Sequence, residues 1–319
     1  MKKKLIFLCI LIFIVYILFF PQDAVTAATD GLVLWYERVL PSLLPFAILS
    51  NILIYSGFTG YLVKLLYPLL RLILPASRNG SFVLLSGFLF GFPMGSKNCA
   101  EMLKCGQLEY QEAEILFMVT NNISPVFISS YILCQELHMP SLIPLSYLVI
   151  FLPPLIAGRL LFFFTEKKQS VSNHSTTYKK PASGSQINFK IIDAGIMNGF
   201  ETLTRLGGYI MLFSMISSMF RLLPLPETTK LMLTGLTEIT NGIKAASQSP
   251  LTPACRYLLA MTFTAFGGLA QTSSMIKGTG LSIKKYGIFK LLMTLITAVL
   301  AWSVVTLVYP SAFLPVCLP

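Results

Sequence analysis

Long apolar segments recur along this chain and leave few ways in which it can fold. They occupy residues 32–55, 112–135, 141–164, 191–222, 253–276 and 287–309. A helix needs about 20 apolar residues to cross a bilayer, where its backbone polar groups have to be satisfied within the segment. Only 12% of the residues are charged, against about 25% in a soluble domain. The sequence therefore predicts an all-α polytopic membrane protein with about 6–8 membrane segments.

The net charge of +11 does not indicate a nucleic-acid-binding protein. The basic residues gather near the ends of the apolar segments, where they orient helices in the bilayer by the positive-inside rule. The sequence has no polar stretch that alternates basic with aromatic residues, as a nucleic-acid surface would. It also has no Cys-x-x-Cys motif and no evident nucleophile–base pair. We therefore expect no nucleic acid, no metal, no cofactor and no enzymatic activity.

Two interpretations of the amino terminus are open. Lys2, Lys3 and Lys4 precede an apolar stretch over 5–20, which suits either a signal peptide cleaved near residues 25–27 or a retained helix. We favour the retained helix because the stretch is longer than most signal-peptide cores. A lysine- and serine-rich stretch over 166–190 is typical of a disordered cytoplasmic linker. The predicted organisation is an N-terminal transmembrane helix over 1–24, a first repeat over 25–165, the linker over 166–190 and a second repeat over 191–319.

The distribution of lysines and arginines predicts that the two repeats are inverted. With a cytoplasmic amino terminus, the linker falls inside the cell, as do Lys277, Lys284, Lys285 and Lys290. This topology requires that segments 81–95 and 229–244 enter the membrane and return on the same side. Whether they are re-entrant or spanning stays open. The opening helix of one repeat then runs inward and that of the other outward. We also expect both opening helices to be interrupted, at the prolines of 40–46 and the glycines of 203–209.

Segments 86–97 and 234–244 share a pattern, since each is apolar, is broken by glycine and ends in Gly-x-Lys. Paired broken segments in the two halves of a membrane protein point to a transporter's binding site. In the first of them, the Phe92-Pro93 step disfavours helix, so a new helix should begin there with free N–H groups that attract anions. The alternatives are close helix packing for the glycines and an interfacial anchor for the lysine. The binding residues predicted in this segment are Gly91, Pro93, Gly95, Ser96 and Lys97.

A polar cluster interrupts the next apolar segment, directly before Pro125. Amides and hydroxyls are costly in hydrocarbon unless they face a partner or a wet cavity, so we predict that they bind a solute or an ion. The alternative is that they only satisfy the backbone carbonyl freed by the proline. The residues concerned are Thr120, Asn121, Asn122 and Ser124.

The second half of the chain supplies counterparts to both elements. Glu238 is a carboxylate within a membrane segment, which makes it a candidate for proton coupling or for pairing with Lys97 or Lys244. A Gly-Gly step follows where the first half has its amides, and it suits a helix break. The binding residues predicted here are Glu238, Asn241, Lys244, Gly267, Gly268, Gln271 and Ser273.

Several of these motifs together resemble a known family, and the resemblance covers roughly residues 25–310. They are Leu-Pro-Ser-Leu-Leu-Pro-Phe at 40–46, Gly-Phe-Pro-Met-Gly-Ser-Lys at 91–97, Thr-Asn-Asn at 120–122, Glu-Ile-Thr at 238–240 and Phe-Gly-Gly-Leu at 266–269. The family is the YlbJ type of sporulation integral membrane protein, in the nucleoside-recognition (Gate) superfamily. The resemblance implies a protein of spore-forming bacteria that moves dipicolinic acid, a small aromatic dianion, from the mother cell toward the forespore.

The sequence and the resemblance together favour a transporter of a small anionic, dipicolinate-like solute. It would lie in the lipid bilayer as a multi-pass protein of the cell membrane, and in sporulating cells in the mother-cell membrane around the forespore. One alternative is a transporter of nucleosides or other small solutes. Another is a sporulation membrane protein that acts in assembly or signalling without transporting anything. Whether the chain forms homo-oligomers is left open.

Overall fold

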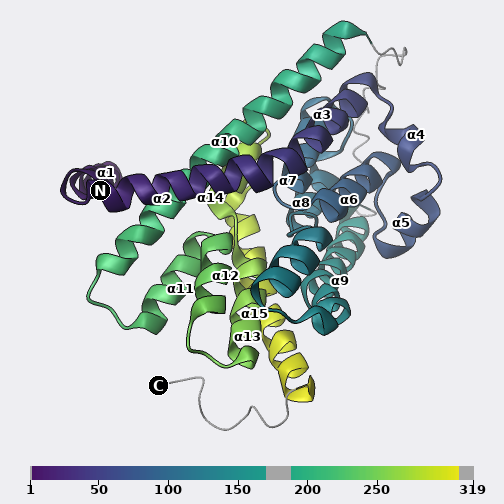
Figure 1. Ribbon diagram of the computed structural model, residues 1–319. Coiled ribbons are helices and arrows are strands. Elements are labelled where there is room, and N and C mark those ends of the chain that lie inside the picture. The colour runs from purple at the N-terminus through teal and green to yellow at the C-terminus, as the bar shows by residue number, and fades with distance from the viewer. Residues whose placement is uncertain (1, 170–187, 309–319) are drawn as a thin grey trace.

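The computed structural model describes residues 2–169 and 188–308, and these ranges contain helices and no strand (Figure 1). Four helical segments are long and apolar enough to cross a membrane, namely Pro21–Ser56, Pro140–Thr165, Phe189–Leu222 and Ile283–Val308. A bent pair, Tyr67–Ile73 with Arg78–Phe90, meets the same test as a unit with a 79° bend. The predicted all-α polytopic membrane architecture is confirmed. Most of the predicted linker, residues 170–187, lies outside the described residues, and its first residues continue the preceding helix to Gln169.

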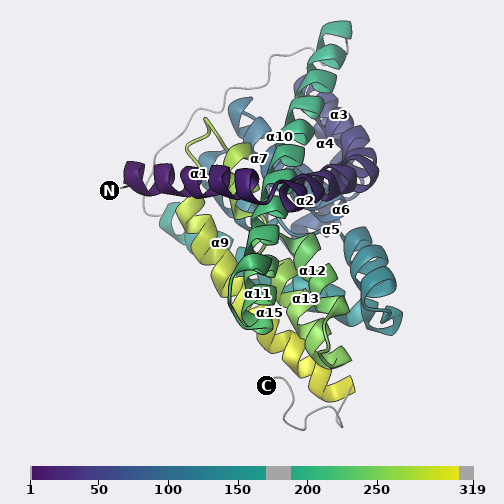
Figure 2. The same ribbon diagram turned by 60° about the vertical axis from the view of Figure 1, so that its left-hand side comes forward.

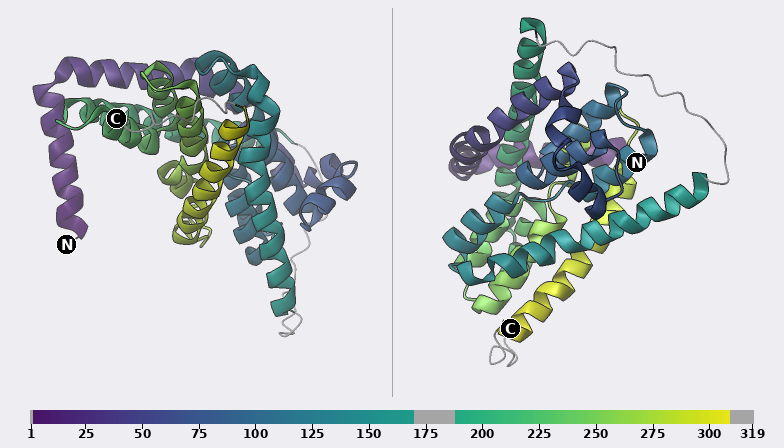
Figure 3. Two further views of the ribbon diagram at one scale, coloured as in Figure 1. Left: turned by 90° about the horizontal axis from the view of Figure 1, so that it is seen from below. Right: turned by 90° about the vertical axis from the view of Figure 1, so that its right-hand side faces the viewer.

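The amino-terminal part forms one long rod preceded by a separate helix. Helix α1 (Lys2–Phe19) is followed by α2 (Pro21–Leu34), η1 (Trp35–Val39) and α3 (Leu40–Ser56), and the last three run on without interruption. Proline at the start of α2 suits a helix start, because its missing N–H would be unpaired there in any case. The left view of Figure 3 shows α1 turning sharply away from α2.

The expected interruptions of the two opening helices are wrong. The chain passes Pro41 and Pro45 as helix, with the wider π-helical turn η1 directly before them. Helix α10 (Phe189–Leu222) is continuous through Gly207. A Cβ at Gly207 would lie 2.7 Å from the Trp35 ring, and the Trp35 indole N–H donates to the Leu203 carbonyl over 2.8 Å. The glycine therefore makes room for an aromatic ring instead of breaking the helix.

Each half contains a hairpin with a break, a second helix with a break and a closing long helix. In the first half these are α6 (Arg78–Phe90) with α7 (Met94–Lys104), α8 (Tyr110–Val119) with η2 (Phe127–Glu136), and α9 (Ile143–Gln169), which the short η3 (Pro140–Leu142) precedes. In the second half they are α11 (Glu227–Thr237) with α12 (Ile239–Gln248), α13 (Pro253–Phe266) with α14 (Leu269–Met275), and α15 (Ile283–Val308). Before the first hairpin, α4 (Thr59–Val63) and α5 (Tyr67–Ile73) expose leucines on an amphipathic surface.

The two halves contact each other through equivalent elements. Helix α10 packs along α2 and α3, and α9 crosses α15, as the right view of Figure 3 shows. The portion after the break in the second helix of each half reaches into the other half. Helix η2 of the first half contacts α12, and α14 of the second half contacts α7. Figure 2 shows α11, α12 and α13 side by side in the second half. This reciprocal pattern is what a two-fold internal repeat produces, while its inverted orientation across the bilayer stays a prediction.

Candidate functional site

The four helix breaks expected from the sequence are present, although the one in segment 234–244 falls at Glu238 and not at a glycine, since Gly235 lies in α11 and Gly242 in α12. They lie at Gly91–Pro93 between α6 and α7, at 120–126 between α8 and η2, at Glu238 between α11 and α12, and at Gly267–Gly268 between α13 and α14. Irregular backbone at membrane depth is tolerated only where it is buried in protein or lines a cavity. The positions of these breaks relative to one another therefore decide what the site can be.

The first two breaks contact each other directly through the backbone. Gly91 has φ +70° and ψ −161°, a conformation that only glycine adopts readily. A Cβ at Gly91 would overlap the backbone nitrogen of Ser124. The Phe92 amide donates to the Asn122 carbonyl over 2.5 Å. One break therefore fixes the other through a backbone hydrogen bond and a contact that leaves no room for a side chain.

The breaks of the second half join the same cluster. Gly268 has φ +88°, and a Cβ there would lie 2.6 Å from the Phe92 ring. A Cβ at Gly267 would overlap Ile239, the first residue of α12. The glycines thus serve close approach of chain segments, which is the packing alternative raised above. Gly95 serves the same end, because a Cβ there would overlap the Thr120 carbonyl.

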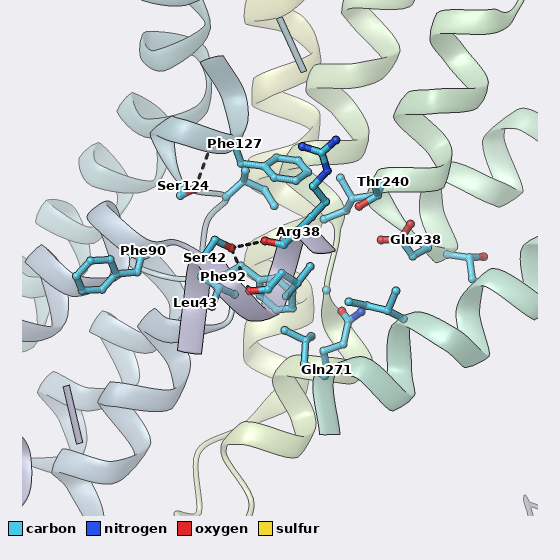
Figure 4. Close-up of a pocket in the computed structure, with 17 residues that line it drawn as sticks. Arg38, Ser42, Leu43, Phe90, Phe92, Ser124, Phe127, Glu238, Thr240 and Gln271 are labelled. Atoms are coloured by element: carbon cyan, nitrogen blue, oxygen red, sulfur yellow. Dashed lines mark hydrogen bonds between the residues drawn. The ribbon is translucent and has the colours of Figure 1, made fainter. Parts of the chain in front are cut away.

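A cavity of about 140 Å³ lies where the four breaks meet (Figure 4). Its polar lining consists of Arg38, Ser42, Ser124, Thr237, Glu238, Thr240 and Gln271. Its aromatic lining consists of Phe90, Phe92 and Phe127. A small apolar cavity with a few convergent polar groups is the common form of a small-molecule site. Four of the predicted residues face this cavity, namely Ser124, Glu238, Gly268 and Gln271.

Glu238 is the acidic group of the cavity and also holds the third break in shape. Its side chain is 7% exposed and accepts a hydrogen bond from the Asn241 backbone N–H over 2.7 Å. This caps the first turn of α12, where a negative charge is favoured. The expected pairing with Lys97 or Lys244 is not found among the ion pairs of residues 2–169 and 188–308.

Arg38 is the basic group of the cavity, and the sequence reasoning missed it. It lies in the π-helical turn η1, a distortion that occurs frequently at functional sites. In Figure 4 its side chain extends on the same side of the cavity as Phe127 and Thr240. It forms no ion pair within the described parts of the chain. In the sequence, Arg38 could have been noticed as a charged residue inside the apolar segment 32–55. The neighbouring prolines led us to interpret that segment as an interrupted helix instead.

Lys97 lies outside this cavity. It is 3% exposed, and its ammonium donates to the Asn51 side-chain oxygen on α3. Asn51 in turn donates to the Gly195 carbonyl over 3.2 Å. Neighbouring Ser96 donates to the Pro93 carbonyl over 2.8 Å and closes the break locally. The interfacial-anchor alternative does not fit a lysine so deeply buried between the two halves.

The predicted amide cluster forms a separate polar core against the second half. Asn121 donates to Thr272 over 2.8 Å and to the Tyr286 hydroxyl over 2.6 Å. Asn122 accepts from Lys290 over 3.2 Å. Thr120 donates to the Leu116 carbonyl over 2.8 Å, but that carbonyl also accepts from the Thr120 backbone N–H and is not the one freed by Pro125. Of the four residues predicted in this cluster, Ser124 is the one that lines the central cavity, where it could contact a solute.

The remaining predicted residues are dispersed. Asn241 donates to Ser214 on α10 over 3.1 Å. Lys244 and Ser273 are exposed and do not line the central cavity. The two Gly-x-Lys motifs therefore do not supply a matched pair of cations, because α12 turns its lysine outward while α7 buries Lys97.

Lys290 was expected among the cytoplasmic lysines at the ends of apolar segments, but its side chain is buried inside the protein. It is 2% exposed on α15, with the Asn122 oxygen and the Tyr286 ring, 5.9 Å away, as its polar surroundings. No carboxylate pairs with it in the described residues. The sequence feature that could have indicated its burial is its position inside the apolar segment 287–309.

Replacing Lys290 with methionine should stabilise the protein by about 1–2 kcal/mol, because it removes an unpaired buried charge whose desolvation costs several kcal/mol. Loss of the hydrogen bond to Asn122 offsets part of this gain. Thermal unfolding in detergent measures the change, with the exposed Lys244→Met as control. A lower midpoint for Lys290→Met than for the wild-type protein would contradict the expectation.

Comparison with known proteins places two of the four breaks within a recognised family region. Residues 37–135 match the family model described as "Gate: Nucleoside recognition". The chain is also similar to the "Sporulation integral membrane protein YlbJ" of Bacillus subtilis (strain 168), with 27% identity over 313 residues. That alignment covers 88% of this chain and 77% of the relative. No solved structure matches.

Proposed function

We propose, from this similarity to a sporulation membrane protein and from the central cavity, that the chain is a secondary transporter for a small aromatic anion such as dipicolinate. The observation that carries the proposal is the meeting of four helix breaks, two from each half, at one cavity with one basic group. Binding sites of many transporters lie where broken helices of two repeats face each other.

The lining suits a planar carboxylate. The Arg38 guanidinium has no ion pair in the described residues and presents a donor geometry that matches a carboxylate with two hydrogen bonds. Phe92 and Phe127 offer faces for an aromatic ring, and Ser124 and Gln271 offer hydrogen bonds. The volume of about 140 Å³ is below the roughly 300–1,000 Å³ of drug-sized sites, which favours a small solute.

A nucleoside transporter is the second candidate, favoured by the family description of residues 37–135. A nucleoside carries no negative charge for Arg38, whereas dipicolinate carries two. Competition between the two solutes therefore separates the candidates. The third reading, a membrane protein that acts in assembly or signalling, predicts that neither solute is bound.

The test is uptake of labelled dipicolinate by the purified protein in proteoliposomes. We expect saturable uptake that unlabelled adenosine and uridine do not compete. Competition by nucleosides would favour the second candidate, and lack of any uptake would overturn the transporter proposal. In a deletion strain, spores with normal dipicolinate content would overturn the cellular role and the proposed location in the mother-cell membrane.

Arg38→Ala should lower dipicolinate uptake by about 10–100-fold, because a charge-assisted hydrogen bond is worth roughly 1.5–3 kcal/mol. Arg38→Lys should recover only part of the uptake, since lysine lacks the planar pair of donors. Arg71→Ala, at an exposed position on α5, is the matched control and should transport normally. Uptake by Arg38→Ala equal to that of the control would remove Arg38 from the site.

A further inference from the structure

A second cavity, of about 340 Å³, lies between the two halves among α7, α10 and α14. Charged side chains dominate its lining, in contrast to the aromatic central cavity. They are Lys97, Glu101, Lys104, Glu201, Arg205 and Lys277.

The two cavities are consecutive along two helices, α10 and α14. On α10, Arg205 lines the charged cavity and Leu206 the central one. On α14, Gln271 faces the central cavity and Ser274, one helical turn further, faces the charged one. A rise of 1.5 Å per residue makes that step about 4.5 Å along the helix. The two cavities therefore lie next to each other along these helices.

Apolar side chains pack around Leu206, next to the step from one cavity to the other on α10. Met94 and Leu203 have no exposed surface, Leu206 is almost fully buried, and the three belong to one packed cluster with Phe92 at its side. We call Met94, Leu203 and Leu206 the apolar partition. A constriction of this kind blocks ions and polar solutes by excluding water, and it opens when its side chains separate.

The charged cavity carries an excess of positive charge. Glu101 pairs with Lys104 over 3.1 Å, and Glu201 pairs with Arg205. Lys97 and Lys277 are left without a carboxylate partner in the described residues. Lys97 is held by the neutral Asn51, so its charge is not cancelled. A cavity with uncompensated cations and low-dielectric walls concentrates anions.

We propose that the charged cavity is a second binding site, an entry vestibule for small carboxylate anions, and that the apolar partition is the gate between it and the central cavity. This inference rests on the proposed function, because it names where the transported anion waits before it reaches Arg38. It also gives Lys97 a place in anion binding that the central cavity alone does not.

The vestibule can be tested by thiol modification, without any transport measurement. Ser274→Cys places a thiol in the charged cavity, and Ser273→Cys places one on the neighbouring exposed position of α14. Each variant is treated with an anionic sulfonatoethyl or a cationic trimethylammonioethyl methanethiosulfonate, and labelling is followed by mass spectrometry of the peptide. Rates are divided by those of a free small thiol to remove intrinsic reactivity.

We expect the ratio of the anionic to the cationic labelling rate to be about tenfold higher at position 274 than at position 273. The additional change Lys97→Met should reduce this preference, and so should Lys277→Met, which alters an exposed residue and leaves the fold intact. Dipicolinate should slow labelling at 274 and not at 273. Equal charge preference at both positions would overturn the vestibule.

The gate is tested by labelling a thiol on its far side. In a Gln271→Cys variant we expect slow labelling, because this position is buried behind the partition. Adding Leu206→Ala should raise the rate at least tenfold, whereas the volume-conserving Leu206→Met should leave it unchanged. An unchanged rate in Leu206→Ala, with the protein still folded by its thermal transition, would overturn the gate. Normal dipicolinate uptake without charge-selective labelling at 274 would overturn the vestibule and leave the proposed function standing.

Discussion

Gly91→Ala is expected to destabilise the protein by about 3 kcal/mol or more. The residue adopts φ +70° and ψ −161°, which costs a residue with a side chain roughly 1–3 kcal/mol. The new methyl group would also overlap the Ser124 backbone, and forcing atoms into a filled space costs roughly 1–3 kcal/mol. Backbone atoms cannot turn aside as a flexible side chain can, so the first two breaks have to separate.

Gly57→Ala is the matched control for this change. Gly57 also has a positive φ, +74°, at the end of α3, but nothing lies within 4 Å of a Cβ there. It should lose only the roughly 1–2 kcal/mol of the left-handed conformation. The difference between the two thermal unfolding midpoints then measures the contact between breaks together with the costlier ψ of Gly91. Equal losses in the two variants would show that Gly91 is required for its conformation alone.

Under the proposed transport function, Glu238→Gln is expected to abolish proton-driven accumulation of dipicolinate while leaving the fold intact. Glutamine keeps an oxygen that accepts from the Asn241 N–H, so the cap of α12 survives. What disappears is a carboxylate that faces the same cavity as Arg38. An ionised carboxylate repels an incoming anion, so anion binding favours the protonated acid and carries a proton with it. Accumulation should fall roughly tenfold or more, since one unit of such coupling equals about 1.4 kcal/mol.

The measurement compares two kinds of transport in the same vesicles. Exchange of labelled for unlabelled dipicolinate at equal pH should persist in Glu238→Gln, whereas accumulation under an inward proton gradient should not. Glu227→Gln, at the exposed start of the same hairpin, is the control and should accumulate normally. Undiminished accumulation by Glu238→Gln would place proton coupling elsewhere.

The helix breaks could be predicted from the sequence because their causes are local. Proline removes an N–H and restricts the residue before it, and paired glycines allow turns that other residues resist. Pro93 and Gly267 therefore marked their breaks without knowledge of the fold. The interruptions expected at Pro41 and Gly207 failed because tertiary context decided the outcome. A π-helical turn accommodates the first, and the Trp35 ring occupies the space that the second provides.

Which residues line the site was less predictable, because this depends on which cavity each side chain faces in the folded protein. Lys97 and Phe92 are five positions apart, yet they line different cavities. Charge counting treated Lys290 as one of a group of end-of-helix lysines, although the packing of α15 buries it against Asn122. Arg38 was overlooked for a different reason, since it stands beside Glu37 in an apolar stretch and belongs to no repeated pattern of charges.

The contacts among the four breaks divide the site into positions with different freedom to vary. At Gly91 and Gly268 a side chain would collide with another part of the chain. Substitutions at these two positions are therefore excluded by packing, independently of any solute. Arg38 and Gln271 line the cavity, as does Ser124, whose hydroxyl also accepts a hydrogen bond from the Phe127 N–H over 3.2 Å and so supports the second break. Under the proposed transport function, a descendant of this chain could therefore change its solute by exchanging Arg38 and Gln271 while the contacts among the breaks stay unchanged.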